Sequence, residues 1–230
     1  MKIFFEACKN GDLNTFNKCL NEGIDINSFD DEGFSPLMLA SIFNRIDIAK
    51  ELIKNNADVN LINNENWTAL IFASFYGHYN IAELLLKNNA DLNIKNKQGF
   101  DALLVAIFYK RTDIIKLLIN YNANVNTKNN EGTTALIYAC NYDDESIVKL
   151  LIDNNVNIND TNNNGTTALM YSALMLKENI IKELLKHNAD INKKDNNGDD
   201  VYAYLKSNDY DSNNTKIINN ICRILKKYSN

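Results

Sequence analysis

Hydrophobic and polar positions recur along this chain at an interval of 33 residues. In each period two apolar residues follow an isoleucine by four and five positions, as Leu52 and Ile53 follow Ile48. Charged residues such as Lys50 take the opposite side, so the spacing predicts a helix with one apolar face. The isoleucines that define this helix are Ile48, Ile81, Ile114, Ile147 and Ile180.

A second, shorter helix is predicted earlier in each period. It follows a residue whose side chain can accept a hydrogen bond from the free N–H groups of a first helical turn. These residues are Ser35, Thr68, Asp101, Thr134 and Thr167. A leucine and an alanine follow three positions apart, as in Leu37 and Ala40, and the small alanine favours close stacking of neighbouring helices.

Asparagine marks the loops between these helices. One repeated position needs a positive φ at a helix end, which glycine adopts freely and asparagine tolerates best among the other residues. It is filled by Gly23, Asn56, Asn89, Asn122, Asn155 and Asn188. A second series is expected to bond loop backbone groups, as Asx turns do. Its members are Asn27, Asn60, Asn93, Asn126, Asn159 and Asn192.

A period of about 33 residues that contains a turn and two helices is typical of a repeat solenoid. The segments 63–70 (Asn-Asn-Glu-Asn-Trp-Thr-Ala-Leu), 76–86 (Tyr-Gly-His-Tyr-Asn-Ile-Ala-Glu-Leu-Leu-Leu) and 89–93 (Asn-Ala-Asp-Leu-Asn) resemble the ankyrin repeat. That family's pattern is a turn, Thr-Pro-Leu-His, Gly-His, a leucine-rich helix and Gly-Ala-Asp-Val-Asn. This chain departs from it by placing apolar residues where the histidine of Thr-Pro-Leu-His stands and by keeping the proline only at Pro36.

The resemblance implies an all-α fold, an ankyrin repeat α-solenoid of helix-turn-helix units with hairpin loops, about seven units in all. We expect a single domain over residues 1–230. Its expected parts are an N-terminal capping repeat at 1–27, full repeats at 28–60, 61–93, 94–126, 127–159 and 160–192, and a C-terminal cap at 193–230. Within that cap we expect a short helix at 201–206, a polar loop at 207–214 and a final amphipathic helix at 215–228.

Charge and cysteine content narrow the partners and the compartment. The net charge of −5 and the absence of a basic run argue against nucleic acid as a partner. The four cysteines have no paired or metal-binding spacing, which suits a reducing compartment. With no signal peptide or membrane span expected, we predict a cytoplasmic protein, or alternatively one exported into a host cell without a cleavable signal.

Catalytic and cofactor motifs are absent from the sequence. There are two histidines, and no glycine-rich phosphate loop, zinc motif or nucleophile elbow. His78 occupies a structural position of the repeat, and His187 is expected near a helix C-terminus. The acidic run 143–145 is expected to be solvated. We therefore predict no enzyme activity, no cofactor and no metal.

The resemblance also implies where a partner would bind. Ankyrin repeats present hairpin tips and inner helices as one concave recognition surface. In this chain the matching positions carry aromatic residues: Phe34, Phe43, Trp67, Phe75, Tyr76, Phe100, Phe108, Tyr109 and Tyr142. We expect this aromatic stripe to bind a protein or peptide with an apolar face. The alternative is that the rings lie flat over neighbouring loops and extend the core.

We therefore predict a non-catalytic protein–protein interaction module, expected as a monomer. It would act as a regulator or scaffold in its own cell. Alternatively it is a host-directed effector, since free-standing ankyrin proteins of microbes and viruses with A/T-rich genomes resemble it. Two further alternatives are a self-assembling structural role and an accessory that inhibits or shields an enzyme.

Overall fold

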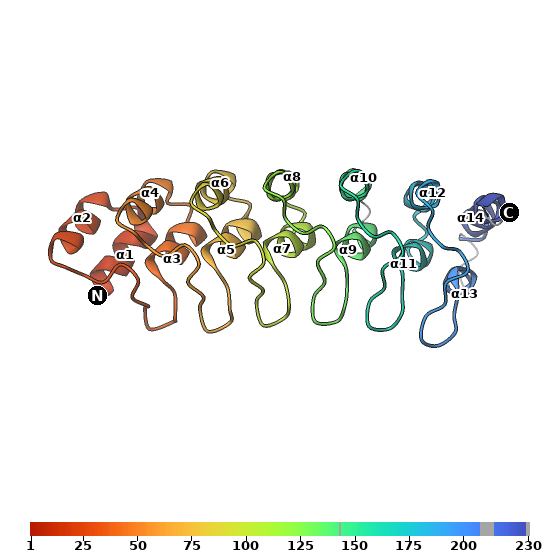
Figure 1. The fold of residues 1–230 in the computed structure, drawn as a ribbon, viewed down its shortest axis with the longest axis horizontal. Coiled ribbons are helices and arrows are strands. Elements are labelled where there is room, and N and C mark those ends of the chain that lie inside the picture. Colours follow the sequence, from red (N-terminus) through yellow and green to blue (C-terminus); the bar gives the residue numbers. More distant parts are fainter. Residues whose placement is uncertain (143, 208–213, 229–230) are drawn as a thin grey trace. The chain divides into compact units, whose positions relative to one another are not determined.

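The computed structural model describes residues 1–142, 144–207 and 214–228. Over these residues the chain is helical apart from loops and two isolated bridges, Lys128 with Thr134 and Thr161 with Thr167. The helices form two compact units, Met1–Asn124 and Val125–Asn230, which we describe one at a time. The predicted all-α fold is confirmed, and Figure 1 shows the helices arranged in successive pairs.

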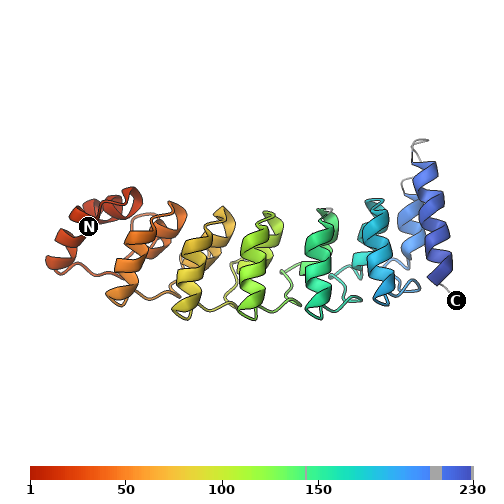
Figure 2. The same cartoon turned by 90° about the horizontal axis from the view of Figure 1, so that it is seen from above.

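The first unit contains four helix pairs. Its inner helices α1, α3, α5 and α7 pack side by side, and its outer helices α2, α4, α6 and α8 form a second layer (Figures 1 and 2). The bounds are α1 Lys2–Asn10, α2 Leu13–Asn21, α3 Pro36–Ile42, α4 Ile46–Lys54, α5 Ala69–Tyr76, α6 Tyr79–Lys87, α7 Ala102–Phe108 and α8 Thr112–Asn120.

The second unit is built in the same way. Inner helices α9, α11 and α13 pack in one row, and outer helices α10, α12 and α14 in the other. The bounds are α9 Ala135–Asn141, α10 Glu145–Asp153, α11 Ala168–Leu174, α12 Glu178–Lys186, α13 Val201–Lys206 and α14 Thr215–Tyr228. The helices expected at 201–206 and 215–228 are present, whereas most of the loop expected at 207–214 lies outside the described residues.

Each expected full repeat contains one helix pair, while the boundary between the compact units falls near the end of the repeat expected at 94–126. The single domain therefore stays a prediction. No helix within the described ranges has the length and apolar content to cross a membrane.

The core is formed by the apolar positions that recur in each repeat. Ala40, Ala73 and Ala106 are completely buried where inner helices meet, and Leu52, Leu85 and Leu118 are completely buried beneath the outer helices. A larger side chain at the alanine positions would push neighbouring inner helices apart, because protein interiors are close-packed.

The predicted N-caps form in both units. The side-chain oxygens of Thr68 and Asp101, for example, accept hydrogen bonds from the backbone N–H groups of Ile71 (3.1 Å) and Leu104 (2.9 Å). Where the family pattern has histidine, the sulfur of Met38 lies 3.4 Å from the backbone nitrogen of Ser35 and closes a capping box. A weak sulfur acceptor thus accompanies the apolar packing at that position.

Asparagine occupies the predicted helix ends, where Asn56, Asn89 and Asn122 have φ of 63°, 62° and 64°. The second asparagine series differs from expectation in its partner. The Oδ1 of Asn60 accepts from the backbone N–H of Asp91 at 2.8 Å, and Asn27 does the same with Asp58 at 2.9 Å. These amides bond the next repeat, because the local Asx turn is already made by the aspartate two positions earlier, as when Asp58 accepts from Asn60.

Three side chains at the starts of outer helices also join neighbouring repeats of the first unit. They are Arg45 before α4, His78 before α6 and Arg111 before α8. The Nε of Arg45 donates to the carbonyl of Lys9 at 2.7 Å, and that of Arg111 donates to Phe75 at 2.9 Å. At the same position in the intervening repeat, the Nε2 of His78 lies 3.2 Å from the Ile42 carbonyl oxygen. These groups bind the carbonyl ends of inner helices, where positive charge is stabilising.

Candidate functional site

Aromatic side chains of the first unit form a connected set, which we call the ring network. Phe72 contacts Phe34 and Trp67, with ring centroids 5.7 and 4.9 Å apart, and Trp67 contacts Phe75 at 5.6 Å. Phe75 lies 4.2 Å from Tyr109, which continues to Phe108 at 5.1 Å. The members of the ring network are Phe34, Trp67, Phe72, Phe75, Tyr76, Phe100, Phe108 and Tyr109.

The hairpin loops fix the rings at one edge of this network. The Oδ1 of Asn63 accepts hydrogen bonds from the backbone N–H groups of Glu65 (3.0 Å) and Trp67 (2.8 Å), and the Asn63 N–H donates to the Trp67 carbonyl at 3.1 Å. Asn96 binds Phe100 in the same way. Both the backbone N–H and the backbone carbonyl of each hairpin ring residue are therefore hydrogen-bonded to an asparagine of the same loop, which holds the ring in place.

Exposure changes across the network. Phe72 is buried, whereas Phe34, Trp67, Phe75 and Phe100 are half-buried. Tyr76, Phe108 and Tyr109 are 42%, 36% and 40% exposed, and the neighbouring Phe43 is 44% exposed without a ring contact among the described residues. The aromatic stripe therefore combines core and surface. Phe75, a member of the predicted stripe, is half-buried and contacts both Tyr76 and Tyr109.

A pocket of about 200 Å³ opens within the ring network. Four rings line it, from Trp67, Phe100, Phe108 and Tyr109, together with Val105 of α7. Asn96 and Gln98 of the same hairpin are the other lining residues, and none of the seven lining side chains is charged. The pocket can therefore accept an uncharged, apolar group, because an unpaired charge would lose its hydration there.

The sequence prediction missed Phe72 and placed Tyr142 in the same stripe. Phe72 lies in the inner-helix core but joins the two hairpin rings Phe34 and Trp67. Comparing the equivalent position in every repeat would have found Phe72. The neighbouring repeats have aliphatic residues there, Leu39 before it and Val105 after it. Tyr142 belongs to the second unit, where it stacks on Tyr138 with centroids 6.4 Å apart.

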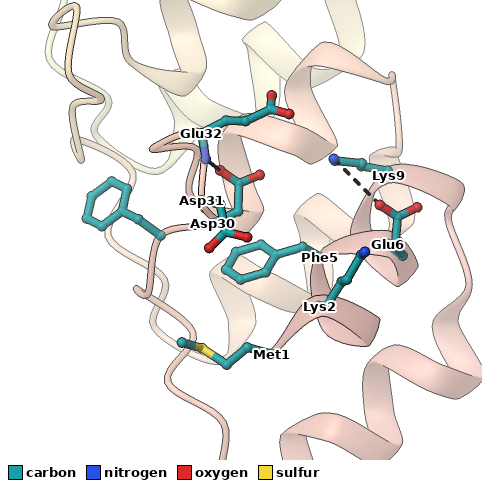
Figure 3. Close-up of a pocket in the computed structure, with 9 residues that line it drawn as sticks. Met1, Lys2, Phe5, Glu6, Lys9, Asp30, Asp31 and Glu32 are labelled. Carbon is teal, nitrogen blue, oxygen red and sulfur yellow. Dashed lines mark hydrogen bonds and ion pairs between the residues drawn. The ribbon is translucent and has the colours of Figure 1, made fainter.

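A second pocket, of about 310 Å³, lies at the first hairpin (Figure 3). It is lined mainly by charged residues, and three of them, Glu6, Lys9 and Asp30, have local partners. The Oδ1 of Asp30 accepts from the backbone N–H groups of Glu32 (3.0 Å) and Phe34 (2.8 Å), and Glu6 pairs with Lys9 at 3.6 Å. The Asp30 bonds stabilise the turn and the Glu6–Lys9 pair lies along α1. Because these charges are used within the fold, we assign the pocket no ligand.

Two buried thiols and one acidic side chain have structural roles. Burial raises the pKa of the Cys8 and Cys140 thiols to about 12, which keeps both protonated near neutral pH. Asp144, expected to be solvated, instead caps α10 by accepting from the backbone N–H groups of Ser146 and Ile147, while Asp143 lies outside the described residues. Across the described ranges no group of three or more metal-ligating side chains comes together.

The helix pairs, stacked in inner and outer rows with a hairpin loop between pairs, define a solenoid of helical repeats. The family model for ankyrin repeats in three copies matches residues 4–96 and 103–195, and the chain belongs to the ankyrin repeat family. Ankyrin repeats are in general non-catalytic modules for protein–protein interaction.

Among solved structures, the chain is similar to the ankyrin repeat domain of Bcl-3, described as a unique member of the IkappaB protein family. The TM-score is 0.85 at 21% sequence identity, with 96% of this chain and 97% of that chain covered. At this identity the likeness concerns the fold alone. No curated protein sequence matches the chain significantly.

Proposed function

We propose that this chain is a non-catalytic binding module that holds a protein or peptide through the ring network of its first unit. The observation that supports this most is a connected set of rings with a buried base and an exposed edge. With about 200 Å² per aromatic side chain, the exposed fractions of Tyr76, Phe108 and Tyr109 leave on the order of 250 Å² of apolar surface, to which the half-buried rings of the network add. Patches of this size are often functional in soluble proteins.

The packing beneath the exposed rings favours binding over a mere extension of the core. Phe75 supports both Tyr76 (4.7 Å) and Tyr109 (4.2 Å), so these side chains are ordered before a partner arrives. Ordered aromatic side chains lose little conformational freedom on binding, which is why they serve as interface anchors. The partner is therefore expected to present apolar side chains that cover this edge.

The compartment we propose is the cytoplasm. Four cysteines without a disulfide, two of them buried, support a reducing environment. A second copy of the chain is one partner with the required apolar chemistry, and light scattering over a range of concentrations tests for it.

The test is a set of matched variants of the full chain. The quartet variant carries Phe43→Ser, Tyr76→Ser, Phe108→Ser and Tyr109→Ser. The control variant carries Ile62→Ser and Tyr79→Ser, two residues of similar exposure in the first unit that belong neither to the ring network nor to the aromatic stripe. Wild-type chain and both variants are used to capture partners from a native lysate, and thermal unfolding is recorded in parallel.

We expect the quartet variant to stay folded and to lose captured proteins that the wild type and the control variant retain. If the quartet variant unfolds instead, the exposed rings are part of the core. If it retains every partner while folded, the ring network is not the binding face. Either result contradicts the proposal.

A further inference from the structure

One inner-helix position varies more in size than its neighbours, and its variation explains the aromatic pocket. Counting by 33 from Leu39, this position is filled by Leu39, Phe72, Val105, Tyr138, Tyr171 and Tyr204. Val105 is the smallest of the six. It lies at the base of the pocket lined by Trp67 and Phe100.

Elsewhere this position reaches the hairpin of the preceding repeat. Phe72 contacts Phe34 with ring centroids 5.7 Å apart, and the hydroxyl of Tyr204 lies 3.1 Å from the hydroxyl of Thr166. Both pairs join residues 38 positions apart. Trp67 and Val105 are the equivalent pair, but here the valine is too short to fill the space beside the tryptophan.

Phe72 shows what a ring does at this position. It lies between the hairpin rings Phe34 and Trp67, the second of which is 4.9 Å away. One repeat later, Trp67 and Phe100 are the corresponding hairpin rings, and the place between them is a pocket of about 200 Å³ rather than a third ring. The pocket thus corresponds to one aromatic side chain that is missing between Phe72 and Tyr138, the ring-bearing residues at this position in the flanking repeats.

The walls of this pocket are fixed. Phe100 meets Phe108 edge to face at 5.7 Å, Phe108 contacts Tyr109, and Tyr109 is supported by Phe75. Gln98 is exposed at the hairpin, where its amide can bond the backbone of a bound peptide. An apolar cavity of about 150 Å³ is enough for a benzene molecule, so a pocket of about 200 Å³ has room for one ring.

We propose that this pocket takes one aromatic side chain from the partner, which supplies the ring that Val105 lacks. This rests on the proposed function and narrows it to a partner segment with a phenylalanine or a comparable ring as its anchor. No acidic side chain lines the pocket to pair with a lysine or arginine, so a cation would have only the ring faces to replace its hydration, whereas an aromatic ring has little hydration to lose.

The chain contains a single tryptophan, Trp67, so its indole N–H resonance reports on the pocket directly. The full chain is titrated with N-acetylphenylalanine amide, with N-acetylalanine amide and with N-acetylarginine amide, and that resonance is followed by NMR. The variants are Val105→Phe, which introduces the residue of the preceding repeat, Val105→Leu, which introduces the residue at Leu39, and Val105→Ile as a near-isosteric control.

We expect a saturable shift with the phenylalanine amide on the wild type and on Val105→Ile. Affinity should be weaker by about tenfold or more in Val105→Phe and by a smaller factor in Val105→Leu. Val105→Phe should remain folded, because Phe72 occupies the equivalent place one repeat earlier. If Val105→Phe unfolds, the affinity of Val105→Leu for the phenylalanine amide decides whether filling the pocket weakens binding. The proposal is overturned by no saturable shift, by equal affinity in the filled variants, or by tighter binding of the arginine amide.

The same variants separate this inference from the proposed function. A captured partner that is lost by the quartet variant but bound equally by wild type and Val105→Phe leaves the binding face in place and overturns the anchor pocket. A partner that both variants bind like the wild type contradicts the proposed function. The amide titration then still decides whether the pocket takes a ring.

Discussion

The two units of this chain use the same helix pairs but finish their hairpin faces with different chemistry. In the first unit, the positions after the turn and on the inner helix carry rings that contact one another, such as Phe34, Phe72 and Trp67. In the second unit, the residues after the turn are Thr133 and Thr166, both buried, and Asp199, which is exposed. The fold thus sets the positions, and the side chains decide whether the face is apolar and open or polar and closed.

In the second unit, side-chain hydrogen bonds accompany the stacked rings of Tyr138 and Tyr142. The hydroxyl of Tyr204 donates to the Oδ2 of Asp195 at 2.9 Å, and the Nδ2 of Asn129 donates to the hydroxyl of Tyr138 at 3.0 Å. Burial raises the pKa of Tyr138 to about 12, because the packed environment disfavours the charged phenolate. A face whose polar groups are paired with each other has less to offer an apolar partner.

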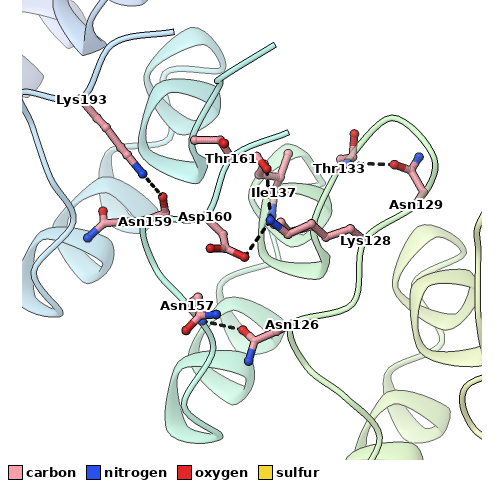
Figure 4. Close-up of polar contacts among 11 residues, drawn as sticks. Asn126, Lys128, Asn129, Thr133, Ile137, Asn157, Asn159, Asp160, Thr161 and Lys193 are labelled. Carbon is pink, nitrogen blue, oxygen red and sulfur yellow. Dashed lines mark hydrogen bonds and ion pairs between the residues drawn. The ribbon is translucent and has the colours of Figure 1, made fainter. Parts of the chain in front are cut away.

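Polar contacts between repeats are also dense in the second unit (Figure 4). The Oδ1 of Asn126 accepts from the backbone N–H of Asn157 at 2.7 Å, and Lys128 pairs with Asp160 at 2.9 Å. Within the hairpin, Asn129 accepts from the backbone N–H of Thr133 at 2.8 Å. We therefore expect substitutions in the two units to differ in kind. Those in the first should alter packing and binding, and those in the second should alter hydrogen bonding and its pH dependence.

The largest expected effect comes from removing the buried ring of the first unit. Phe72→Ala should lower the free energy of unfolding by about 3 kcal/mol, because a buried phenylalanine leaves a cavity that its neighbours fill only in part. Urea unfolding followed by the fluorescence of Trp67 measures this in the first unit. A loss below about 1 kcal/mol would show that the ring network is not anchored in the core.

Removing a hydroxyl from the second unit is the matched experiment. Tyr204→Phe keeps the ring but takes the donor from Asp195 and the partner from Thr166, at an expected cost of about 1.5 kcal/mol. Hydrogen exchange of the amides around α11 and α13 measures it. An unchanged protection pattern would mean that the polar network of the second unit adds nothing to its stability.

The same substitution has a predicted pH dependence. The backbone N–H of Asp199 and then the Tyr204 hydroxyl hold the pKa of Asp195 below its ordinary value. Because the folded pKa is depressed, this stabilisation is present above the unfolded pKa and is lost as the pH falls through the folded value. Tyr204→Phe should raise the pKa of Asp195 toward its ordinary value, as measured by carboxyl NMR titration. A pKa that stays at the wild-type value would exclude the hydroxyl as a cause.

A smaller effect should be equal in the two units. Asn60→Ala and Asn159→Ala each remove the acceptor for a backbone N–H of the next repeat, that of Asp91 or Asp190 at 2.8 Å. We expect a loss of about 1 kcal/mol in each case. Hydrogen exchange of the Asp91 and Asp190 amides should increase in the respective variant. Strongly unequal losses would mean that the repeats are not joined in the same way throughout.

The smallest expected effect on stability comes from Phe43, an exposed residue of the aromatic stripe that lies outside the ring network. Phe43→Ser should change the free energy of unfolding by no more than about 0.5 kcal/mol, since the side chain is exposed and makes no ring contact among the described residues. Urea unfolding again provides the measurement. A loss comparable with that of Phe72→Ala would show that Phe43 is a core residue and not a candidate binding residue.

The helices could be predicted because their determinants are local and recur in each period. The caps Thr68 and Asp101, the alanine ladder and the positive-φ asparagines each act within a few residues of their own position, and each appears as expected. The partners of Asn27 and Asn60 could not be predicted, because the choice between a local turn and the next repeat depends on how repeats stack.

Most members of the candidate site could be predicted from the sequence, but the burial and packing of their rings could not. A sequence shows that Trp67, Phe75 and Tyr109 share a face, yet not which ring lies beneath another. Phe75 is half-buried because Tyr76 and Tyr109 lie close to it, and the pocket exists because Val105 is short where Phe72 is long. Both are properties of neighbouring repeats in contact, which appear only when the chain is folded.

The most direct test of the binding face is the affinity of a captured partner for the wild-type chain and for the folded quartet variant, measured by isothermal titration calorimetry. If the ring network is the binding face, the quartet variant should bind at least about 30-fold more weakly, the equivalent of one interface anchor of about 2 kcal/mol. A dissociation constant within about twofold of the wild-type value would contradict the account.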